Sequence, residues 1–305
     1  SSDLELFLAE RRNHITGSTI FPSLEGTRPI LVEIQCLVSN ANFNAPQRNV
    51  NGFDLNDDVL KKAIDENIID ATFESIEEIN TNQIDLIILA VPPKQTLELF
   101  NKLDYLWNTK ITITDTSSVK NHIKLKDVNN IVLSHPIAGS DKSGIDALDK
   151  NLFTEKKNIL CNPFDANEDH LKRVESFWVN ALNMRVEMMT VAEHDLIFAM
   201  TSHLPHLVSY ALIDSIRTSN LNVKDNSGGG LREFLRLSGS NAEMWRDIFM
   251  LNRVDLIKAL AGMQVSLNNL LELMTETKQI PDIFSHDEML KNELKEIKSF
   301  KEDKF

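Results

Sequence analysis

Short apolar runs rich in β-branched residues alternate with helical stretches over residues 30–190. The run at residues 86–91, Leu-Ile-Ile-Leu-Ala-Val, is apolar at every position, which is typical of a strand buried on both faces of a sheet. Alternation of strands and helices predicts an α/β domain, with a parallel sheet between two layers of helices. The predicted strands are 30–38, 50–54, 85–91, 111–115, 131–134, 158–161 and 185–189, and the predicted helices are 57–67, 94–107 and 165–182.

From residue 191 onward the pattern is almost entirely helical, so we expect an all-α domain to follow. Residues 240–243, Ser-Asn-Ala-Glu, fit a capping box in which Ser240 begins a helix and Glu243 reaches back. The next helix carries a seam of apolar residues at alternating spacings of four and three, namely Leu256, Leu260, Met263, Leu267, Leu270 and Met274. Such a seam packs against another helix, within the chain or in a dimer.

These patterns divide the chain into an N-terminal arm at residues 1–28, the α/β domain at 29–190, the helical domain at 191–286 and a charged tail at 287–305. The seam favours a homodimer formed through the helical domain.

Composition excludes several classes of protein. The net charge of −13 on 305 residues argues against a nucleic-acid binder, because phosphate binding needs a basic surface. Cys36 and Cys161 cannot form a disulfide framework, which favours a reducing cytoplasm. The N-terminus lacks the pattern of a signal peptide, and no apolar run approaches the roughly 20 residues that cross a bilayer. We therefore expect a cytoplasmic protein that binds neither nucleic acid nor membrane.

His135 is the first candidate for chemistry. It follows the predicted strand 131–134 and precedes Pro136, so it lies where a parallel strand ends, the edge at which open α/β sheets bind ligands. A histidine there can act as a general base, since its unperturbed pKa is near 6.5, but a structural role is also open. Residues 115–120, Asp-Thr-Ser-Ser-Val-Lys, reach the same edge as a ligand-binding turn or a helix cap.

Further histidines gather along the sequence where the two domains join. His135, His170, His194 and the pair His203/His206 are expected to cluster there. His203 and His206 share one helical face, whereas His194 points to the opposite face, so these three cannot bind one metal on a straight helix. The His-x-x-His spacing also lacks the glutamate of helical zinc motifs, and no metal site is predicted.

Arg232 and Arg236 lie four residues apart, directly after the glycine turn at residues 228–230. Arginine binds carboxylate and phosphate groups through two parallel hydrogen bonds, so this segment could hold an anionic ligand. The alternative is that Glu233 and nearby acids neutralise both arginines at the surface.

Six segments together resemble the prephenate dehydrogenase family in order and spacing, over about residues 49–274. They are 115–120, 135–144 (His-Pro-Ile-Ala-Gly-Ser-Asp-Lys-Ser-Gly), 193–195 (Glu-His-Asp), 202–206 (Ser-His-Leu-Pro-His), 228–230 with Arg236, and 244–247 (Met-Trp-Arg-Asp). The resemblance implies a Rossmann-like parallel sheet domain followed by an all-α domain that binds substrate and dimerises. It also implies oxidative decarboxylation of prephenate to 4-hydroxyphenylpyruvate in tyrosine biosynthesis, with hydride transfer to NAD⁺ or NADP⁺.

The resemblance assigns roles to individual residues. His135 would take the proton of the substrate's ring hydroxyl, and Ser118 would hold both groups in place. Arg236 would bind the ring carboxylate. The remaining substrate residues would be His206, Gly229, Ser140, Asp141 and His203, with His194 and Trp245 behind them, and the cofactor would contact Asp54, Val91, Pro92 and Ser118.

The first strand departs from the family. Members carry Gly-x-Gly-x-x-Gly after it, which lets the cofactor's pyrophosphate approach the backbone at a helix N-terminus. Here Ile34, Cys36 and Ser39 occupy the expected glycine positions, and no Gly-x-Gly precedes residue 228. Three functions follow: a prephenate dehydrogenase with an unusual cofactor loop, an arogenate dehydrogenase, or a relative that binds prephenate-like acids or a partner without cofactor.

Overall fold

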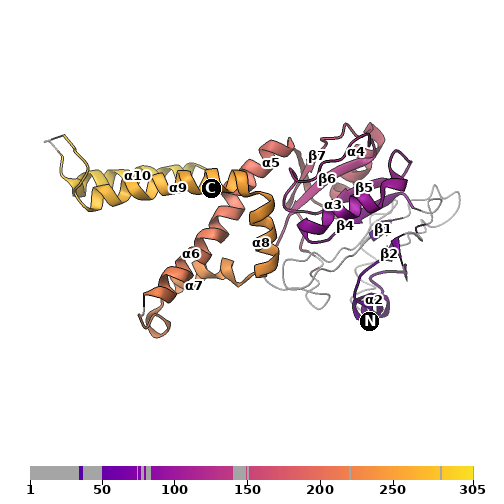
Figure 1. Ribbon diagram of the computed structural model, residues 1–305, viewed down its shortest axis with the longest axis horizontal. Helices are drawn as coiled ribbons and strands as arrows, with labels where there is room; N and C mark the ends of the chain where they lie inside the picture. The colour runs from indigo at the N-terminus through magenta and orange to yellow at the C-terminus, as the bar shows by residue number, and fades with distance from the viewer. Residues whose placement is uncertain are drawn as a thin grey trace. The chain divides into compact units, whose positions relative to one another are not determined.

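The computed structural model describes residues 50–73, 75–76, 79, 84–139, 149, 151–219, 221–281 and 284–304, and the backbone alone at 34–36 and 224. The chain forms two compact units, Ser1–Arg253 and Val254–Phe305. The first unit contains the sheet and the helices that surround the candidate site (Figure 1).

The strands of the first unit form one sheet in the order β3-β2-β1-β4-β5-β6-β7-β8. Four pairings are parallel: β2 with β3, β4 with β5, β5 with β6, and β7 with β8. Strand β1 is antiparallel to both neighbours, and β6 is antiparallel to β7. The strand bounds are β1 Ile34–Cys36, β2 Val50–Gly52, β3 Ala71–Thr72, β4 Leu86–Leu89, β5 Thr112–Asp115, β6 Ile131–Ile137, β7 Lys157–Cys161 and β8 Arg185–Met188.

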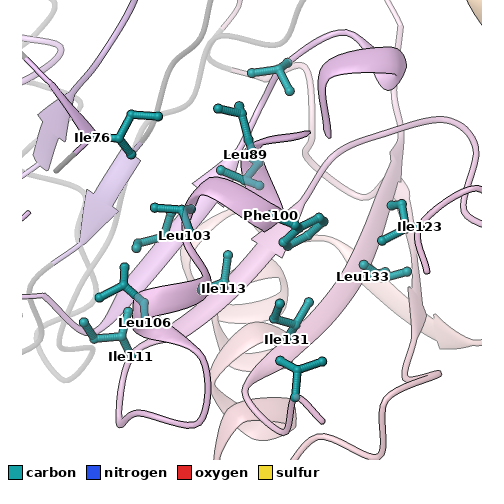
Figure 2. Packing of buried hydrophobic residues seen from close by; sticks show 14 of the residues in the cluster. Ile76, Leu89, Phe100, Leu103, Leu106, Ile111, Ile113, Ile123, Ile131 and Leu133 are labelled. Atoms are coloured by element: carbon teal, nitrogen blue, oxygen red, sulfur yellow. The ribbon is translucent and has the colours of Figure 1, made fainter. Parts of the chain in front are cut away.

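Both faces of the central strands β4 and β5 are buried, and successive residues of each strand contact opposite faces. In β4, Ile87 and Leu89 join one hydrophobic cluster, whereas Leu86 and Ile88 join the other. The first cluster, part of which Figure 2 shows, is covered by α3, which contributes Phe100. The second is covered by α2 and α4. The apolar runs therefore form central strands, as the sequence predicts.

The helices of the α/β part are α2 Asp57–Asp65, α3 Pro93–Lys102 and α4 Glu168–Ser176, with a 3₁₀ turn at Asp104–Leu106 and a π-helical turn at Phe177–Ala181. Helix α2 begins at Asn56, whose side chain accepts a hydrogen bond from Asp58 N–H, and Asp57 and Asp58 occupy its positively polarised first turn. Helix α3 begins at Pro93, a residue that needs no hydrogen-bond acceptor at a helix start.

The helical part of the first unit begins at a capping box, in which the side chains of Thr190 and Glu193 each bond the other's main chain. Its elements are α5 Val191–Phe198, a π-helical turn Ala199–His203, α6 Leu204–Thr218, a 3₁₀ turn Lys224–Asn226, α7 Gly229–Leu235, a 3₁₀ turn Arg236–Gly239 and α8 Ala242–Leu251. The predicted cap at Ser240 is wrong by one residue. Asn241 begins α8, and its side chain accepts from both Glu243 N–H and Met244 N–H.

The continuous helical run Val191–Thr218 is long and apolar enough, by length and composition, to cross a membrane. The expectation that no segment approaches this length is therefore wrong. The run carries His194, Asp195 and His203, which are buried and hydrogen-bonded to other elements of the first unit. These contacts pack one side of the run against the first unit, while Leu196, Ile197 and Met200 on the same run are exposed.

The second unit contains most of α9, Arg253–Met274, and α10, His286–Lys304. Of the seam on α9, Leu256 is buried, while Leu260, Leu267 and Met274 are exposed. Helix α10 occupies the predicted charged tail and has no buried residue. The seam thus remains largely available to a second copy of the chain.

The predicted class, a Rossmann-like sheet followed by helices, is confirmed, with two differences of detail. Strand β6 continues to Ile137, because its second half pairs antiparallel with β7. His135 is therefore inside a strand and not after it, although the parallel pairing of β5 and β6 covers only its first residues. Strand β1 is three residues long within the predicted 30–38, and it runs against β2 and β4.

Candidate active site

A buried ion pair joins Asp115 and Lys120 where β5 ends. Lys120 Nζ lies 2.6 Å from Asp115 Oδ2, and neither side chain is exposed. The same Nζ donates to the main-chain carbonyl of Ser134 in β6. The carboxylate of Asp115 also accepts from the N–H groups of Ser117 and Ser134, each at 3.0 Å. Because buried charges are costly unless paired and hydrogen-bonded, this network fixes the segment after β5 against β6.

Asp195, in the middle of α5, holds the same segment from the helical side. Its Oδ1 accepts from Lys120 N–H at 2.9 Å, and its Oδ2 accepts from Asn121 N–H at 2.8 Å. Burial raises the pKa of Asp195, but the hydrogen bonds from His194, Lys120 and Asn121 outweigh burial and lower the pKa below its ordinary value. Asp195 is therefore a carboxylate at neutral pH.

His135 and His194 form a hydrogen-bonded chain that ends on Asp195. His194 Nδ1 lies 2.7 Å from Asp195 Oδ1, and His194 Nε2 lies 2.8 Å from His135 Nδ1. A carboxylate only accepts, so Nδ1 of His194 carries a hydrogen and donates it. Nε2 of neutral His194 then accepts from Nδ1–H of His135. This assignment leaves Nε2 of His135 without a hydrogen, as a general base requires.

Burial keeps both imidazoles neutral. It lowers the pKa of His135 well below 6.5, and positive charge on His194 and Lys120 would lower it further. Burial also lowers the pKa of His194, and the hydrogen bond to Asp195 offsets only part of that effect. Phe198 packs against both rings, with centroid separations of 4.7 Å to His135 and 4.6 Å to His194. A partly apolar surrounding thus holds a neutral base in one orientation.

His203 is buried one helical segment further on. Its Nδ1 accepts from Asn252 Nδ2 at 3.1 Å, and the same amide donates to the main-chain carbonyl of Asp195 at 2.8 Å. Burial lowers the pKa of His203 to about 4, so the ring is neutral and carries its hydrogen on Nε2. That Nε2 and the indole Nε1 of Trp245 are buried donors with no hydrogen-bond partner in the described part of the chain.

His206 stacks on Trp245, with ring centroids 3.5 Å apart and ring planes at 20°. Its Nδ1 donates to the main-chain carbonyl of Ser202 at 2.9 Å, which leaves Nε2 as an acceptor. Burial lowers the pKa of His206, and the charge of Arg236 lowers it further, although the bond to Ser202 acts in the opposite direction. His206 and Arg236 are therefore close enough to interact electrostatically.

Arg236 begins the 3₁₀ turn after α7 and is more than half exposed. Its Nε donates to Glu233 Oε1 at 3.2 Å, an exposed pair that contributes little to stability. Gly229 begins α7, and a Cβ added there would meet nothing within 4 Å. Both interpretations of Arg236, anion binding and neutralisation by Glu233, therefore remain open, since Arg236 contacts Glu233 and its side chain is more than half exposed.

The nucleotide side of the site differs from the expected arrangement. Because β1 is antiparallel, Cys36 at its end pairs with Leu86, at the amino end of β4. Leu89 and Asp115, the carboxyl ends of β4 and β5, pair at the opposite edge of the sheet. A pyrophosphate-binding turn must follow the first strand at the carboxyl edge. The direction of β1 and the glycine-free sequence at residues 37–49 do not fit a dinucleotide held in this way.

The other predicted site residues fall in three groups. Ser118 is half-buried in the segment after β5, and among the described hydrogen bonds none joins it to His135. Val91, Pro92 and Asp54 follow β4 and β2 at the carboxyl edge, where Asp54 is buried and accepts from Asn56 N–H at 2.8 Å. Ser140 and Asp141 lie outside the described residues.

His170 does not join the histidine cluster, which corrects that expectation. Its Nδ1 lies 2.7 Å from Thr112 Oγ1, at the amino end of β5, because β7 runs antiparallel to β6 and α4 therefore begins at that edge. Sequence reasoning also missed the roles of Asp195, Lys120 and Asn252. The His-Asp pair directly after a Thr-x-x-Glu capping box was the available signal for Asp195. A search of the described residues finds no group of three or more His, Cys, Asp or Glu side chains that could hold a metal ion.

Two family models match consecutive parts of the chain. The nucleotide-binding domain of prephenate dehydrogenase matches residues 42–187, and the dimerization domain of prephenate dehydrogenase matches residues 190–291. The crystal structure of prephenate dehydrogenase from Aquifex aeolicus in complex with hydroxyphenyl propionate and NAD⁺ is 32% identical. Its similarity covers 84% of this chain and 89% of that chain, with a TM-score of 0.74.

Curated relatives agree. The cyclohexadienyl dehydrogenase of Zymomonas mobilis is 28% identical over 224 residues, which are 70% of this chain and 76% of that protein. The prephenate dehydrogenase of Bacillus subtilis is 29% identical over 222 residues, 69% of this chain. The chain spans only 59% of the length of the Bacillus enzyme.

A second, shorter similarity is to a different family of proteins. The DNA repair protein RadA of Bacillus subtilis is 54% identical over 52 residues, which are 17% of this chain and 11% of that protein. RadA proteins of Halalkalibacterium halodurans and other bacteria match over similar lengths. The dehydrogenase similarity is nevertheless the extensive one. With two domain models in register over residues 42–291 and a solved relative covering most of its length, this chain belongs to the prephenate dehydrogenase family.

Proposed function

We propose that this chain carries the substrate-binding and proton-transfer residues of a dehydrogenase that converts prephenate to 4-hydroxyphenylpyruvate in tyrosine biosynthesis. The observation that carries the proposal is the chain from Asp195 through His194 to His135, which leaves Nε2 of His135 as a free acceptor. In the family, the hydride goes to NAD⁺ or NADP⁺.

His135 acts as the general base. Its Nε2 accepts the proton of the ring hydroxyl as that carbon is oxidised to a carbonyl, and positive charge then develops on the imidazole. His194 and the Asp195 carboxylate stabilise this charge through the two hydrogen bonds. They also keep the ring in the tautomer that accepts at Nε2. His194 is thus a positioning residue, and Ser118 is proposed to orient the hydroxyl.

Arg236 binds the carboxylate on the substrate ring. A guanidinium stays charged at any pH the protein meets, so it holds the anion without donating a proton to it. Loss of this carboxylate as CO₂ makes the ring aromatic, which supplies the driving force, and the protein mainly positions the reacting groups. The unpartnered donors of His203 and Trp245 are proposed to face oxygen atoms of the bound acid. Gly229, Ser140 and Asp141 remain proposed parts of this pocket.

One observation favours arogenate as a second candidate substrate. His206 offers an acceptor at Nε2, since its Nδ1–H is committed to Ser202 and its pKa is lowered. An acceptor pairs with the ammonium group of arogenate, whereas the keto acid side chain of prephenate has no donor to offer. If His206 lines the side-chain pocket, as the family resemblance suggests, this geometry raises the preference for the amino acid.

The oligomer and the location follow the family. The match to a dimerization domain and the exposed seam on α9 support a homodimer formed through the helical domain. We propose that this dimer acts in the cytoplasm.

Turnover assays test the function. The purified full chain is mixed with prephenate or arogenate and with NAD⁺ or NADP⁺, and reduced nicotinamide is followed at equal concentrations. Turnover of prephenate supports the first proposal. A kcat/KM for arogenate at least tenfold higher supports the second, and His206→Gln should then reduce the difference. Failure of the chain to bind either acid by calorimetry contradicts both.

A further inference from the structure

We propose that the segment before about Val50 has a different origin from the rest of the chain, and that the chain therefore binds its acid substrate but lacks the dinucleotide site of its family. This inference rests on the proposed function for the acid site alone. Its two supports are the direction of β1 and the distribution of similarity along the sequence.

The direction of β1 is the structural support. In a doubly wound sheet the first strand is parallel to its neighbours, so the following turn delivers backbone N–H groups to the pyrophosphate at the carboxyl edge. Here Gln35 pairs antiparallel with Asn51 of β2 and with Ile87 of β4. The end of β1 at Cys36 therefore lies beside Leu86, at the amino edge, a strand length away from Asp115.

The sequence gives independent support. The dehydrogenase models begin only at residue 42, and the similarity to RadA spans 52 residues. Residues 1–41 form the longest stretch that neither model covers, so we infer that the 52-residue RadA similarity lies there and extends at least eleven residues past residue 41. The identity to RadA reaches 54% over its 52 residues, far above the 28–32% of the dehydrogenase relatives. A segment this similar to another family explains why the glycine turn is missing.

The replaced segment should abolish cofactor binding and leave acid binding intact. The acid site uses residues from 115 onward, all within the dehydrogenase similarity, whereas the pyrophosphate site of the family depends on the turn after the first strand. Each hydrogen bond to a charged phosphate that is lost weakens binding on the order of tenfold to one hundredfold. Losing several of them takes a typical cofactor affinity beyond the millimolar range.

Calorimetry on the full chain is the first arm of the test. The full chain is titrated with hydroxyphenyl propionate, the acid present in the Aquifex structure, and separately with NAD⁺ and NADP⁺. We expect the acid to bind and neither dinucleotide to bind at up to about millimolar concentration. Dinucleotide binding at micromolar concentration by the unaltered chain overturns the inference.

An exchange of segments is the second arm. Residues 1–50 are replaced by the corresponding N-terminal segment of the Aquifex aeolicus enzyme, and a matched control carries the same segment with its turn glycines changed to valine. We expect NAD⁺ affinity to rise at least one hundredfold in the first graft and to remain undetectable in the second. Equal affinity in the two grafts, or in the graft and the unaltered chain, contradicts the proposal.

The reciprocal exchange guards against a graft that fails to fold. The Aquifex enzyme receives residues 1–50 of this chain in place of its own segment, and should lose NAD⁺ binding while it keeps hydroxyphenyl propionate binding. Retained NAD⁺ binding overturns the inference. A first graft that binds NAD⁺ but turns over neither prephenate nor arogenate contradicts the proposed function and leaves the inference standing.

Discussion

The two halves of the sheet are built in different ways. Around β5 and β6, strands of four and seven residues end in a buried network that joins Asp115, Lys120, Ser134 and Asp195 across three elements. Around β1 to β3, the strands are two or three residues long, and the first runs against its neighbours. The first half holds a reacting group in place through many side chains, whereas a nucleotide site in the second half depends on one backbone turn. Side-chain substitutions should therefore affect the β5–β6 half strongly and the β1–β3 half only weakly.

The largest effect is expected from His135→Asn, measured on whichever of the full chain and the glycine-bearing graft turns over. Asparagine keeps a polar group but cannot take the proton, so kcat should fall by about 10²–10⁴. Acid binding should change little, because Arg236 is retained. His286→Asn in the second unit is the matched control and should leave kcat unaltered. A loss in His135→Asn smaller than tenfold would remove His135 from its role.

Lys120→Met tests the buried network itself. The substitution leaves the Asp115 carboxylate buried without its cation, which should cost about 3–5 kcal/mol of unfolding free energy. Urea denaturation measures the change. Lys172→Met, which breaks an exposed pair with Glu168, is the control and should stay within about 0.5 kcal/mol. If the two variants lose similar amounts, the network does not hold this half together.

Stability should fall as the pH drops below 6.5. The pKa of His203 is about 4 in the folded chain because the ring is buried, whereas it is near 6.5 when unfolded. Between these values the unfolded chain binds more protons, so unfolding becomes easier as the pH falls, by about 3 kcal/mol from this group at pH 4. Urea denaturation at pH 7, 6, 5 and 4 should show this slope. His203→Asn keeps an acceptor for Asn252 and should flatten the slope by about one proton. An unchanged slope would mean that His203 is not held neutral.

Arg236→Gln addresses the exposed part of the acid site. Removal of a charged hydrogen-bond donor should weaken hydroxyphenyl propionate binding by about tenfold to one hundredfold. The thermal midpoint should hardly move, because the pair with Glu233 is exposed. Arg232→Gln, one turn earlier, provides the control. Equal weakening in both variants would favour a general surface charge effect, in which case neither arginine binds the acid specifically.

The smallest effect is expected in the β2 half. A Cβ at Gly52 would lie 2.8 Å from Ile69 Cδ1, the far end of a flexible side chain that can move aside. Gly52→Ala should therefore cost no more than about 1 kcal/mol in urea denaturation, at the lower end of the range for overpacking. A loss above about 3 kcal/mol would show that this half is packed as rigidly as the β5–β6 half.

Much of the fold could be predicted, because the apolar runs from Val50 onward mark strands that are buried on both faces. The helices predicted to start at residues 57 and 94 start at Asp57 and, one residue earlier, at Pro93. The direction of β1 could not be predicted, since a strand of either direction has the same period of two. The cap at Asn241 was assigned one residue early because Ser240 and Asn241 are both good capping residues.

The site, like the fold, could be predicted only in part. The sequence predicted His135 directly after a strand, whereas that strand continues through it to Ile137, and its role as a base stays a prediction. Its orientation could not be predicted, because His194 is 59 residues away in the sequence and its tautomer depends on the next residue, Asp195. Contacts between distant buried side chains follow from packing and not from any local pattern. Ser118 stays a prediction without a described contact.

The antiparallel pairing of β1 has a meaning beyond this site. The backbone N–H and C=O groups of a sheet can pair with a strand of either direction and of almost any sequence. The position between β2 and β4 can therefore accept many different strands. A domain can thus keep its shape after an exchange of its first segment and lose a ligand that the shape normally accompanies. The fold and the ability to bind a ligand are thus inherited through different parts of the backbone, and we propose that this chain has kept the first without the second.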